Sequence, residues 1–464
     1  MTERISYPAH ARALLALGLP IIGSHLAQMG LHVTDTVLLG WYGVHELDAV
    51  VLGTSFFFML FILGSGFGIG VMGMVASALG RGDETRVRRN TRMGLWLSIL
   101  YSLLTVPVIW WSAPVLRFAR QDPEVAALAQ NFLRIAGFGM MPALLVMVLK
   151  SYLAALERTQ VVLWVTLSAV ALNFAIAWVF IFGRWGAPEL GVRGAAIASL
   201  ATQCLTFVLL ALYASLSPGS RRFRLFQRFW RPDWQAFAQV LRIGAPIGLT
   251  GLAESGLFIA AAVMMGWIGT VQLAAHGIAM EIAALAFMFH LGLSNAATVR
   301  IGRAEGEGDT LSMRDAAATA IAMSFSFGVV IVTLFLSLPH PLIGLFLDES
   351  KPEAAAILSY GTTLLAMAAL FQLFDAMQVI ALGLLRGMQD TRAPMWIAAV
   401  SYWLIGIPCS YFLAFVWKYG GPGLWLGLAA GLAFAATLLM LRFWRGPWFR
   451  ESGFERASIQ PREI

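Results

Sequence analysis

Ionisable side chains occur deep within long apolar segments of this sequence, where a charge is costly in free energy. Asp35 lies in an apolar run from Ala13 to Tyr42. It is preceded, at spacings of 3, 4 and 3 residues, by a set of polar side chains: His25, Gln28 and His32. At 100° per residue these four side chains fall within about 80° of one another on a helix. A polar stripe on a membrane helix must face protein or water, so we predict that it lines a functional cavity.

The position of Asp35 along its segment leaves an alternative open. Asp35 is 23 residues from Arg12, which is about 34 Å along a helix, so it belongs in the outer half of the first crossing. There it could be an interfacial charge that only anchors the helix end. The polar stripe favours the cavity, and the anchor is the competing hypothesis.

A second pair of carboxylates lies near the middle of two later segments. Glu254 and Asp375 are 12 and 11 residues from the arginines at the ends of their segments, about 18 and 16 Å along a helix, so both are expected near the membrane midplane and could meet. Hydroxyl and amide side chains flank them: Thr250, Ser255, Gln372 and Gln378. Such oxygen-rich surroundings suit a proton, a sodium ion or an organic cation. Two carboxylates that are merely hydrogen-bonded in a helix interface are the alternative. For Glu281 and His290, which also lie in membrane segments, packing against a polar neighbour is as reasonable as a function.

The elements that hold these side chains are membrane helices. Of 464 residues, 59% are hydrophobic and 12% are charged, about half the charged fraction of a soluble domain, and the mean hydropathy is +0.75. The apolar runs are long and continuous instead of alternating over ~10 residues, which predicts helices that span a membrane. We place twelve of them, near 13–41, 47–79, 93–115, 131–155, 161–183, 193–216, 240–268, 273–300, 315–338, 357–385, 395–417 and 422–441.

Positive charge is concentrated in alternate connections between these segments. The largest groups of arginine lie at 81–92, 221–231 and 442–450, and the positive-inside rule puts these connections and both termini in the cytoplasm. The net charge of +7 then belongs to loop ends beside an anionic leaflet and not to a nucleic-acid surface. The first segment is too long for a cleaved signal and is expected to remain as a helix. The sequence has no Asn-x-Ser/Thr sequon, which fits a prokaryotic inner membrane.

The two halves of the chain repeat each other at one constant offset in numbering, which we call the repeat offset. It is defined by Leu17 to Ile21, which recurs as Ile243 to Ile247. Further matches continue at the same offset: Gly30 with Gly256, Gly40-Trp41 with Gly266-Trp267, Gly43 with Gly269, and Leu47 with Leu273. Each half holds six crossings, so both halves enter the membrane in the same sense. The predicted fold is an all-α integral membrane protein with two six-helix bundles related by a pseudo-two-fold axis along the membrane normal.

This repeat predicts a domain organisation that is typical of transporters, with a cavity between two bundles. We expect an N-terminal lobe at 1–216, a basic cytoplasmic linker at 217–239, a C-terminal lobe at 240–441 and a cytoplasmic tail at 442–464. The halves differ in chemistry, because Ala261 stands at the position equivalent to Asp35.

Several motifs of this chain resemble those of the multidrug and toxic compound extrusion (MATE) family, NorM-like branch. They are Leu17 to Ile21, VTDTVLLG with Asp35, Asn173 in ALNFAI, Ala275-His276 in LAAHGIA, and FQLFDAMQVIALGLLRGMQDTRAPM from Phe371 to Met395. The resemblance covers essentially the whole chain. It implies a secondary transporter and not an enzyme: an H⁺- or Na⁺-coupled antiporter that exports amphipathic, mostly cationic organic compounds by alternating access. Gly277, where NorM-like sequences often carry Gln, and the additional acid Glu281 are departures.

The resemblance also implies roles for particular residues. Asp35 and Asn173 in one lobe, and Glu254 and Asp375 in the other, are expected to bind the coupling cation or the substrate. The supporting polar residues are His25, Gln28, His32, Glu281, Gln372 and Gln378. A sodium ion would bind at Glu254, Asp375 or Asp35, and no cofactor or resident metal is expected besides this transported ion. The expected partners are small organic cations and the lipid bilayer, with no nucleic acid, and the chain is expected to act as a monomer.

Two other functions compete with this interpretation. A flippase of a lipid-linked precursor on the same architecture would need several Arg or Lys side chains for phosphate, whereas the intramembrane charges here are mostly acids. A membrane-embedded enzyme would use His25, His32 and Asp35 as a metal or acid-base cluster, but no second histidine pair or nucleophile elbow accompanies them. Cys204 and Cys409 lie in separate apolar segments and indicate neither a disulfide framework nor a metal motif.

Overall fold

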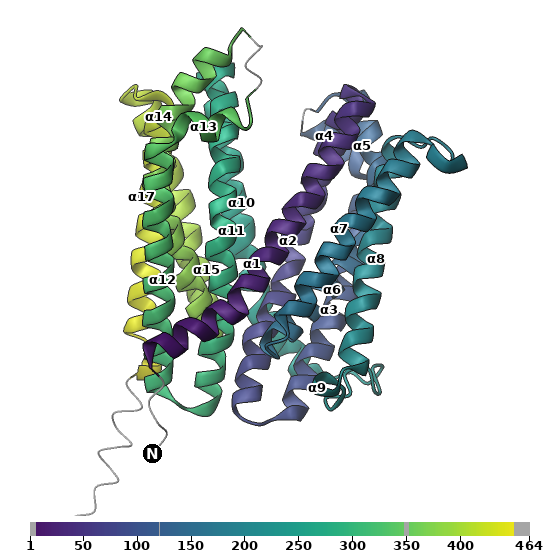
Figure 1. Ribbon diagram of the computed structural model, residues 1–464, viewed down its shortest axis with the longest axis vertical. Helices are drawn as coiled ribbons and strands as arrows, with labels where there is room; N and C mark the ends of the chain where they lie inside the picture. Colours follow the sequence, from purple (N-terminus) through teal and green to yellow (C-terminus); the bar gives the residue numbers. More distant parts are fainter. Residues whose placement is uncertain (1–5, 120, 348–351, 450–464) are drawn as a thin grey trace, which may run out of the picture. The chain divides into compact units, whose positions relative to one another are not determined.

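The computed structural model describes residues 6–119, 121–347 and 352–449, and the regular secondary structure of these residues is helical (Figure 1). Within this part of the chain, twelve helical segments are long and apolar enough to cross a membrane. Each coincides with one of the twelve apolar segments predicted from the sequence. The prediction of an all-α membrane protein is therefore confirmed.

The first half of the chain contributes six of these crossings. They are α1 (Tyr7–Tyr42), α2 (Val44–Gly80), α3 (Glu84–Trp110), the continuous run of α5 (Pro123–Ala136), η1 (Gly137–Gly139) and α6 (Met140–Ala155), α7 (Thr159–Phe182) and α8 (Val192–Leu216). Short helices occupy the connections: α4 (Ser112–Phe118), η2 (Arg184–Gly186) and α9 (Pro218–Arg221).

The second half contributes the other six. Five are α10 (Trp234–Ile268), α11 (Thr270–Glu307), α12 (Thr310–Ser337), α14 (Ala354–Gly387) and α17 (Gly420–Trp444). The eleventh crossing is composite and includes two π-helical segments: α15 (Arg392–Ala399), η3 (Val400–Gly406, π), α16 (Ile407–Tyr411) and η4 (Phe412–Val416, π). The short α13 (Pro339–Gly344) and η5 (Pro447–Phe449) complete this half.

The turns recur at the repeat offset that the sequence predicts. Gly82 and Gly308, which follow α2 and α11, both have a φ of 70°, a left-handed conformation that glycine adopts at little cost. The next residues, Asp83 and Asp309, cap α3 and α12. Each of these carboxylates accepts a hydrogen bond of 2.9 Å from the backbone amide three residues later, which satisfies an otherwise unpaired donor of the helix terminus. The same local sequence therefore produces the same backbone in both halves.

The first helix of each half begins against the second helix of the other half. At Gly244 of α10, an added Cβ would lie 2.7 Å from the Cα of Phe67 in α2. At Gly18 of α1, an added Cβ would lie 3.9 Å from the Cα of Leu293 and 3.7 Å from the Cβ of Ala296, both in α11. Gly18 with Gly244, and Phe67 with Leu293, are again related by the repeat offset. The absence of a side chain at Gly244 allows the backbones of α10 and α2 to approach closely, whereas a Cβ at Gly18 would make ordinary contact with α11.

The chain forms two compact units as a result. The N-terminal unit comprises residues 19–251, and the C-terminal unit comprises residues 1–18 and 252–464. The start of α1 thus belongs with the second half of the chain, and the start of α10 belongs with the first. The segment predicted as a linker, 217–239, lies within the N-terminal unit. The predicted tail, 442–464, begins inside α17, and its residues 450–464 lie outside the described part of the chain.

The C-terminal unit is organised around α14, which packs against α11, α12 and α17. Ser294 Oγ of α11 donates to the carbonyl oxygen of Val379 at 2.6 Å, and Thr298 Oγ1 donates to that of Gly383 at 2.9 Å. Small residues and hydroxyl-to-carbonyl bonds hold two membrane helices close together. This contact fixes α14 with its polar residues 372–378 inside the unit.

Candidate cation-binding sites

Asp35 accepts two side-chain hydrogen bonds inside the N-terminal unit. Asn173 Nδ2 of α7 donates to Oδ1 at 2.8 Å, and Ser199 Oγ of α8 donates to Oδ2 at 3.5 Å. Thr202 Oγ1, also of α8, donates in turn to Asn173 Oδ1 at 3.2 Å. Leu38, one turn after Asp35, is 1% exposed in the core of this unit. A network from three helices is more than an interfacial anchor requires, so Asp35 is held by side chains of the N-terminal unit, while the cavity remains a prediction.

The rest of the predicted stripe on α1 is less buried. His25 is half-buried and hydrogen-bonded to Gln28, whereas Gln28 and His32 are exposed. Lys150 of α6 lies near enough to His25 for their charges to interact. This cation is absent from the predicted set, although a lone lysine inside an apolar segment is itself a signal of function.

A second polar cluster joins three helices of the C-terminal unit. Gln378 Nε2 of α14 donates to Glu254 Oε1 of α10 at 3.4 Å and to Tyr402 Oη of η3 at 2.5 Å. Asp375, one turn before Gln378, is 3% exposed and lies near enough to Glu254 for their charges to interact. The structure therefore brings together the two carboxylates that the sequence places near the midplane.

Several polar atoms of this cluster have no hydrogen-bond partner among the described residues. They are Asp375 Oδ1, Gln378 Oε1 and both amide atoms of Gln372. Because most buried polar groups in proteins are paired, a group of unpaired polar atoms indicates a place where a cation or a water molecule can bind. Carboxylate and amide oxygens are ligands of hard cations, and a proton would equally neutralise the carboxylate. In the described residues, no group of three or more His, Cys, Asp or Glu side chains could hold a metal ion.

Tyr402 is the member of this cluster that no sequence pattern identifies. It is fully buried in η3, and the next residue, Trp403, donates from Nε1 to the carbonyl oxygen of Ala253 at 3.2 Å. Two consecutive residues of η3 are therefore connected to the surroundings of Glu254. Trp403 binds the preceding residue, Ala253, and Tyr402 binds Gln378, which also donates to Glu254. π-Helical turns are frequent at functional sites. The only available sequence signal is that a buried tyrosine hydroxyl needs a partner.

Other ionisable residues near the second cluster have separate environments. Arg386 of α14 is half-buried and interacts electrostatically with Glu254. Glu281 is exposed on α11 and is not part of the buried cluster. His290 is fully buried, and its Nδ1 lies 2.7 Å from Ser324 Oγ of α12, which is the packing alternative considered for it.

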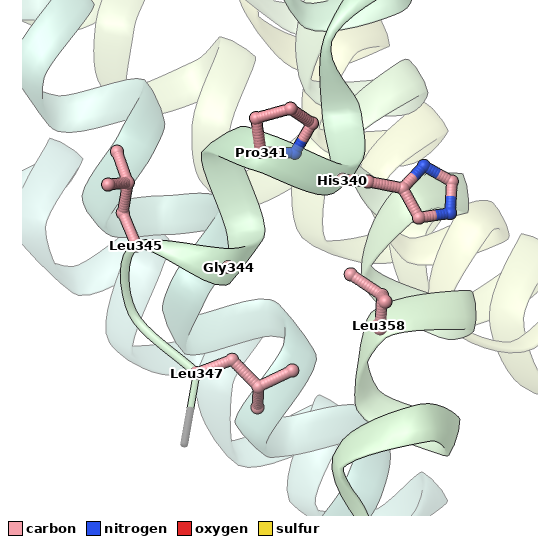
Figure 2. Close-up of a pocket in the computed structure, with 6 residues that line it drawn as sticks. All are labelled: His340, Pro341, Gly344, Leu345, Leu347 and Leu358. Carbon is pink, nitrogen blue, oxygen red and sulfur yellow. The ribbon is translucent and has the colours of Figure 1, made fainter. Parts of the chain in front are cut away.

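A surface hollow of about 410 Å³ lies elsewhere in the C-terminal unit, beside α13 (Figure 2). Its lining is mostly apolar and consists of His340, Pro341, Gly344, Leu345, Leu347 and Leu358. It contains none of the predicted site residues. The buried polar clusters, and not this hollow, are therefore the candidate sites.

Known proteins match this chain over segments that contain both clusters. The MatE family model matches residues 20–179 and 246–412. The probable multidrug resistance protein NorM of Rhizobium meliloti is 48% identical over 95% of this chain and 94% of the relative, and that of Agrobacterium fabrum is 44% identical over 94% of each. The segments matched by the family model include all four principal residues of the two clusters: Asp35, Asn173, Glu254 and Asp375.

Solved structures share the fold at low sequence identity. The eukaryotic MATE transporter AtDTX14 is similar with a TM-score of 0.86 at 19% identity, covering 98% of this chain and 100% of that one. A MOP superfamily transporter from Pyrococcus furiosus is similar with a TM-score of 0.83 at 20% identity, covering 95% and 97%. At such identities, the likeness shows the fold alone.

Proposed function

This chain belongs to the MatE family and is a multidrug efflux transporter similar to NorM, not an enzyme, and we propose that it is a cation-coupled antiporter. It exchanges H⁺ or Na⁺ for amphipathic, mostly cationic organic compounds by alternating access. The observation that carries the proposal is the cluster of unpaired oxygens around Asp375, buried among membrane helices.

Burial of Asp375 supplies the reason for coupling. An ionised carboxylate that is buried without a partner costs several kcal/mol. Asp375 therefore holds a proton, a sodium ion or the positive group of a substrate, and one occupant excludes the others. A coupling cation that enters from outside neutralises the carboxylate and weakens its hold on a cationic compound, which then leaves.

The N-terminal cluster provides a second place for the same exchange. Asn173 holds Asp35 with a hydrogen bond of 2.8 Å, and Thr202 orients the amide of Asn173 by binding its oxygen. An amide fixed in this way leaves its nitrogen as a donor to the ionised carboxylate. Asp35 is then ready to accept a cation without moving its neighbours.

The setting of this exchange follows from the relatives and the charge distribution. The two sequence relatives named above are bacterial, and the arginine-rich connections favour an inner membrane with both termini in the cytoplasm. We expect the protein to act as a monomer, since each candidate cluster is complete within one chain.

The test is dye efflux from proteoliposomes under pH and sodium gradients imposed separately. One of the two gradients should drive efflux in the wild-type protein, and the gradient that does so identifies the coupling ion. Fluorescent lipid precursors with a phosphate headgroup serve as the second substrate. Movement of these lipids without an ion gradient, together with no dye efflux, would establish the flippase alternative and contradict the proposal.

A further inference from the structure

The connection between α8 and α10, residues 217–233, packs on one side against other helices of the N-terminal unit. Phe223 and Leu225 are 1% and 2% exposed. Phe229 stacks on Trp96 of α3 with ring centroids 5.4 Å apart, and the indole Nε1 of Trp96 donates to the carbonyl oxygen of Phe229 at 2.8 Å. Arg92 of α3 also donates to the backbone of this connection, at Gln227 O. These contacts give the connection one fixed conformation.

The other side of the connection carries exposed positive charge. Arg221, Arg224, Arg228 and Arg231 are all exposed, and backbone hydrogen bonds of 3.1 Å close turns from Arg221 to Arg224 and from Arg228 to Arg231. Successive turns therefore begin and end at arginines. Within the described part of the chain, none of these four forms an ion pair, whereas their neighbour Arg222 lies 3.5 Å from Glu84. Two tryptophans accompany them, Trp230 at 73% and Trp234 at 72% exposed.

Two of these arginines occupy a backbone conformation that is unfavourable for them. Arg224 and Arg228 have φ of 46° and 55°, in the left-handed region where glycine or asparagine is preferred. Strain of this kind persists only when the surrounding structure fixes it, and it is found most often at functional sites. Lys418 has a similar φ of 60°, so what distinguishes Arg224 and Arg228 is that this conformation is combined with a cluster of exposed arginines.

We propose that this surface, the arginine face (Arg221, Arg224, Arg228 and Arg231 with Trp230 and Trp234), binds the anionic headgroups of phospholipids. A guanidinium group pairs with a phosphate through two parallel hydrogen bonds, and exposed tryptophan is typical of the level of lipid headgroups. Four unpaired arginines beside two such tryptophans fit the phosphate-bearing edge of a bilayer. This proposal is independent of the proposed transport function.

The competing explanation is that these arginines only set membrane topology. The positive-inside rule needs charge in a loop but no particular turn geometry. It does not account for arginine in left-handed positions, nor for exposed tryptophans beside them.

The backbone strain allows a test that separates binding from folding. Glycine at positions 224 and 228 relieves the strain while removing the charge, so Arg224→Gly and Arg228→Gly are expected to fold at least as well as the wild type. Lys418→Gly is a matched control, because Lys418 is an exposed cation with φ of 60° in the C-terminal unit. Arg231→Gln removes a charge at a position whose backbone is not in the left-handed region.

Binding of phosphatidylglycerol and phosphatidylcholine to the purified full chain is measured by native mass spectrometry. Each arginine near an anionic surface contributes about 1 kcal/mol, which is roughly fivefold in affinity. We expect each single arginine variant to bind phosphatidylglycerol roughly fivefold more weakly and the double glycine variant roughly thirtyfold. Lys418→Gly should bind as the wild type does, and cysteine labelling should show unchanged topology in all variants.

Several results would overturn the proposal. The first is undiminished phosphatidylglycerol binding in both the double glycine variant and Arg231→Gln. The second is equal binding of phosphatidylcholine, or an equal loss in Lys418→Gly. The third is displacement of the lipid by millimolar glycerol phosphate, since a site for a free phosphate would not need the bilayer. Inverted topology in the arginine variants would show that these charges act in insertion alone.

Discussion

Replacement of Asp375 by asparagine should abolish coupling and leave the fold intact. Asp375 is 3% exposed, and its Oδ1 has no hydrogen-bond partner among the described residues. A protonated carboxyl group and an amide have nearly the same shape, and both are neutral. The expected change in the free energy of unfolding without the coupling cation is therefore no more than about 1 kcal/mol, at the low end for a buried position.

The coupling cation itself should distinguish the two proteins. A ligand that binds only the folded state at 100 times its dissociation constant stabilises it by about 2.7 kcal/mol. For units of about 230 residues, each kcal/mol raises Tm by roughly 2–4 °C. The wild type should therefore gain about 5–10 °C on addition of its coupling cation, while Asp375→Asn should gain almost nothing.

The assay is thermal unfolding in detergent across sodium concentrations and across pH, with potassium salts at equal ionic strength, beside efflux in proteoliposomes. Asp315→Asn is the control, since Asp315 is a second buried carboxylate of the same unit, 6% exposed, and accepts a hydrogen bond from Tyr7 at 3.2 Å. This control should keep the cation-dependent rise in Tm. If Asp375→Asn also keeps it and exports at the wild-type rate, Asp375 does not bind the coupling cation.

Three further predictions concern single contacts. Asp35→Asn should express normally but lower the initial efflux rate at least tenfold between pH 6 and 8, because an amide cannot exchange a cation; wild-type efflux would restore the anchor hypothesis. Tyr402→Phe removes a buried hydrogen bond, which should lower the free energy of unfolding by about 1–3 kcal/mol and also change the cation dependence of efflux. The control is Tyr360→Phe, which loses the bond of 2.9 Å from Gly421 N and should change stability alone. The hydrogen bond from Arg89 lowers the pKa of Asp233, so their pair should stabilise the protein above about pH 4 by at most about 1 kcal/mol. This contribution should disappear as pH falls through the lowered pKa, and Asp233→Asn should show a correspondingly flatter acid profile of Tm.

The twelve crossings and the repeat were predictable because each depends on local sequence. Length and hydropathy define a membrane helix, and a left-handed turn needs glycine wherever it recurs. Gly82 and Gly308 have the same φ of 70° because both end a helix before a capping aspartate. Spacing along α14 likewise predicts that Gln372, Asp375 and Gln378 lie one turn apart on a single face, and the structure buries all three.

Contacts between distant segments were not predictable in the same way. The sequence divides naturally near residues 217–239, yet the compact units divide within α1 and α10, because the start of α1 contacts α11 near Gly18 and the start of α10 contacts α2 near Gly244. The π-helical turn that brings Tyr402 to Gln378 depends on how η3 packs against α17. Intrinsic preferences do not specify a π-helical turn, so only the packed structure shows it.

The two halves share the turn before a capping aspartate, at Gly82 and Gly308, but they differ in the chemistry of their candidate sites. At the repeat offset, Glu254 corresponds to Gln28, and Asp35 corresponds to Ala261. One unit therefore has a single carboxylate held by an amide, whereas the other has two carboxylates near enough for their charges to interact. Two like charges at one site resist being ionised together, so the paired site takes up a first cation more readily than a lone carboxylate with the same burial would. Under the proposed function, a cation therefore meets unequal sites in the two halves, while the ion gradient, and not this inequality, sets the direction of net exchange.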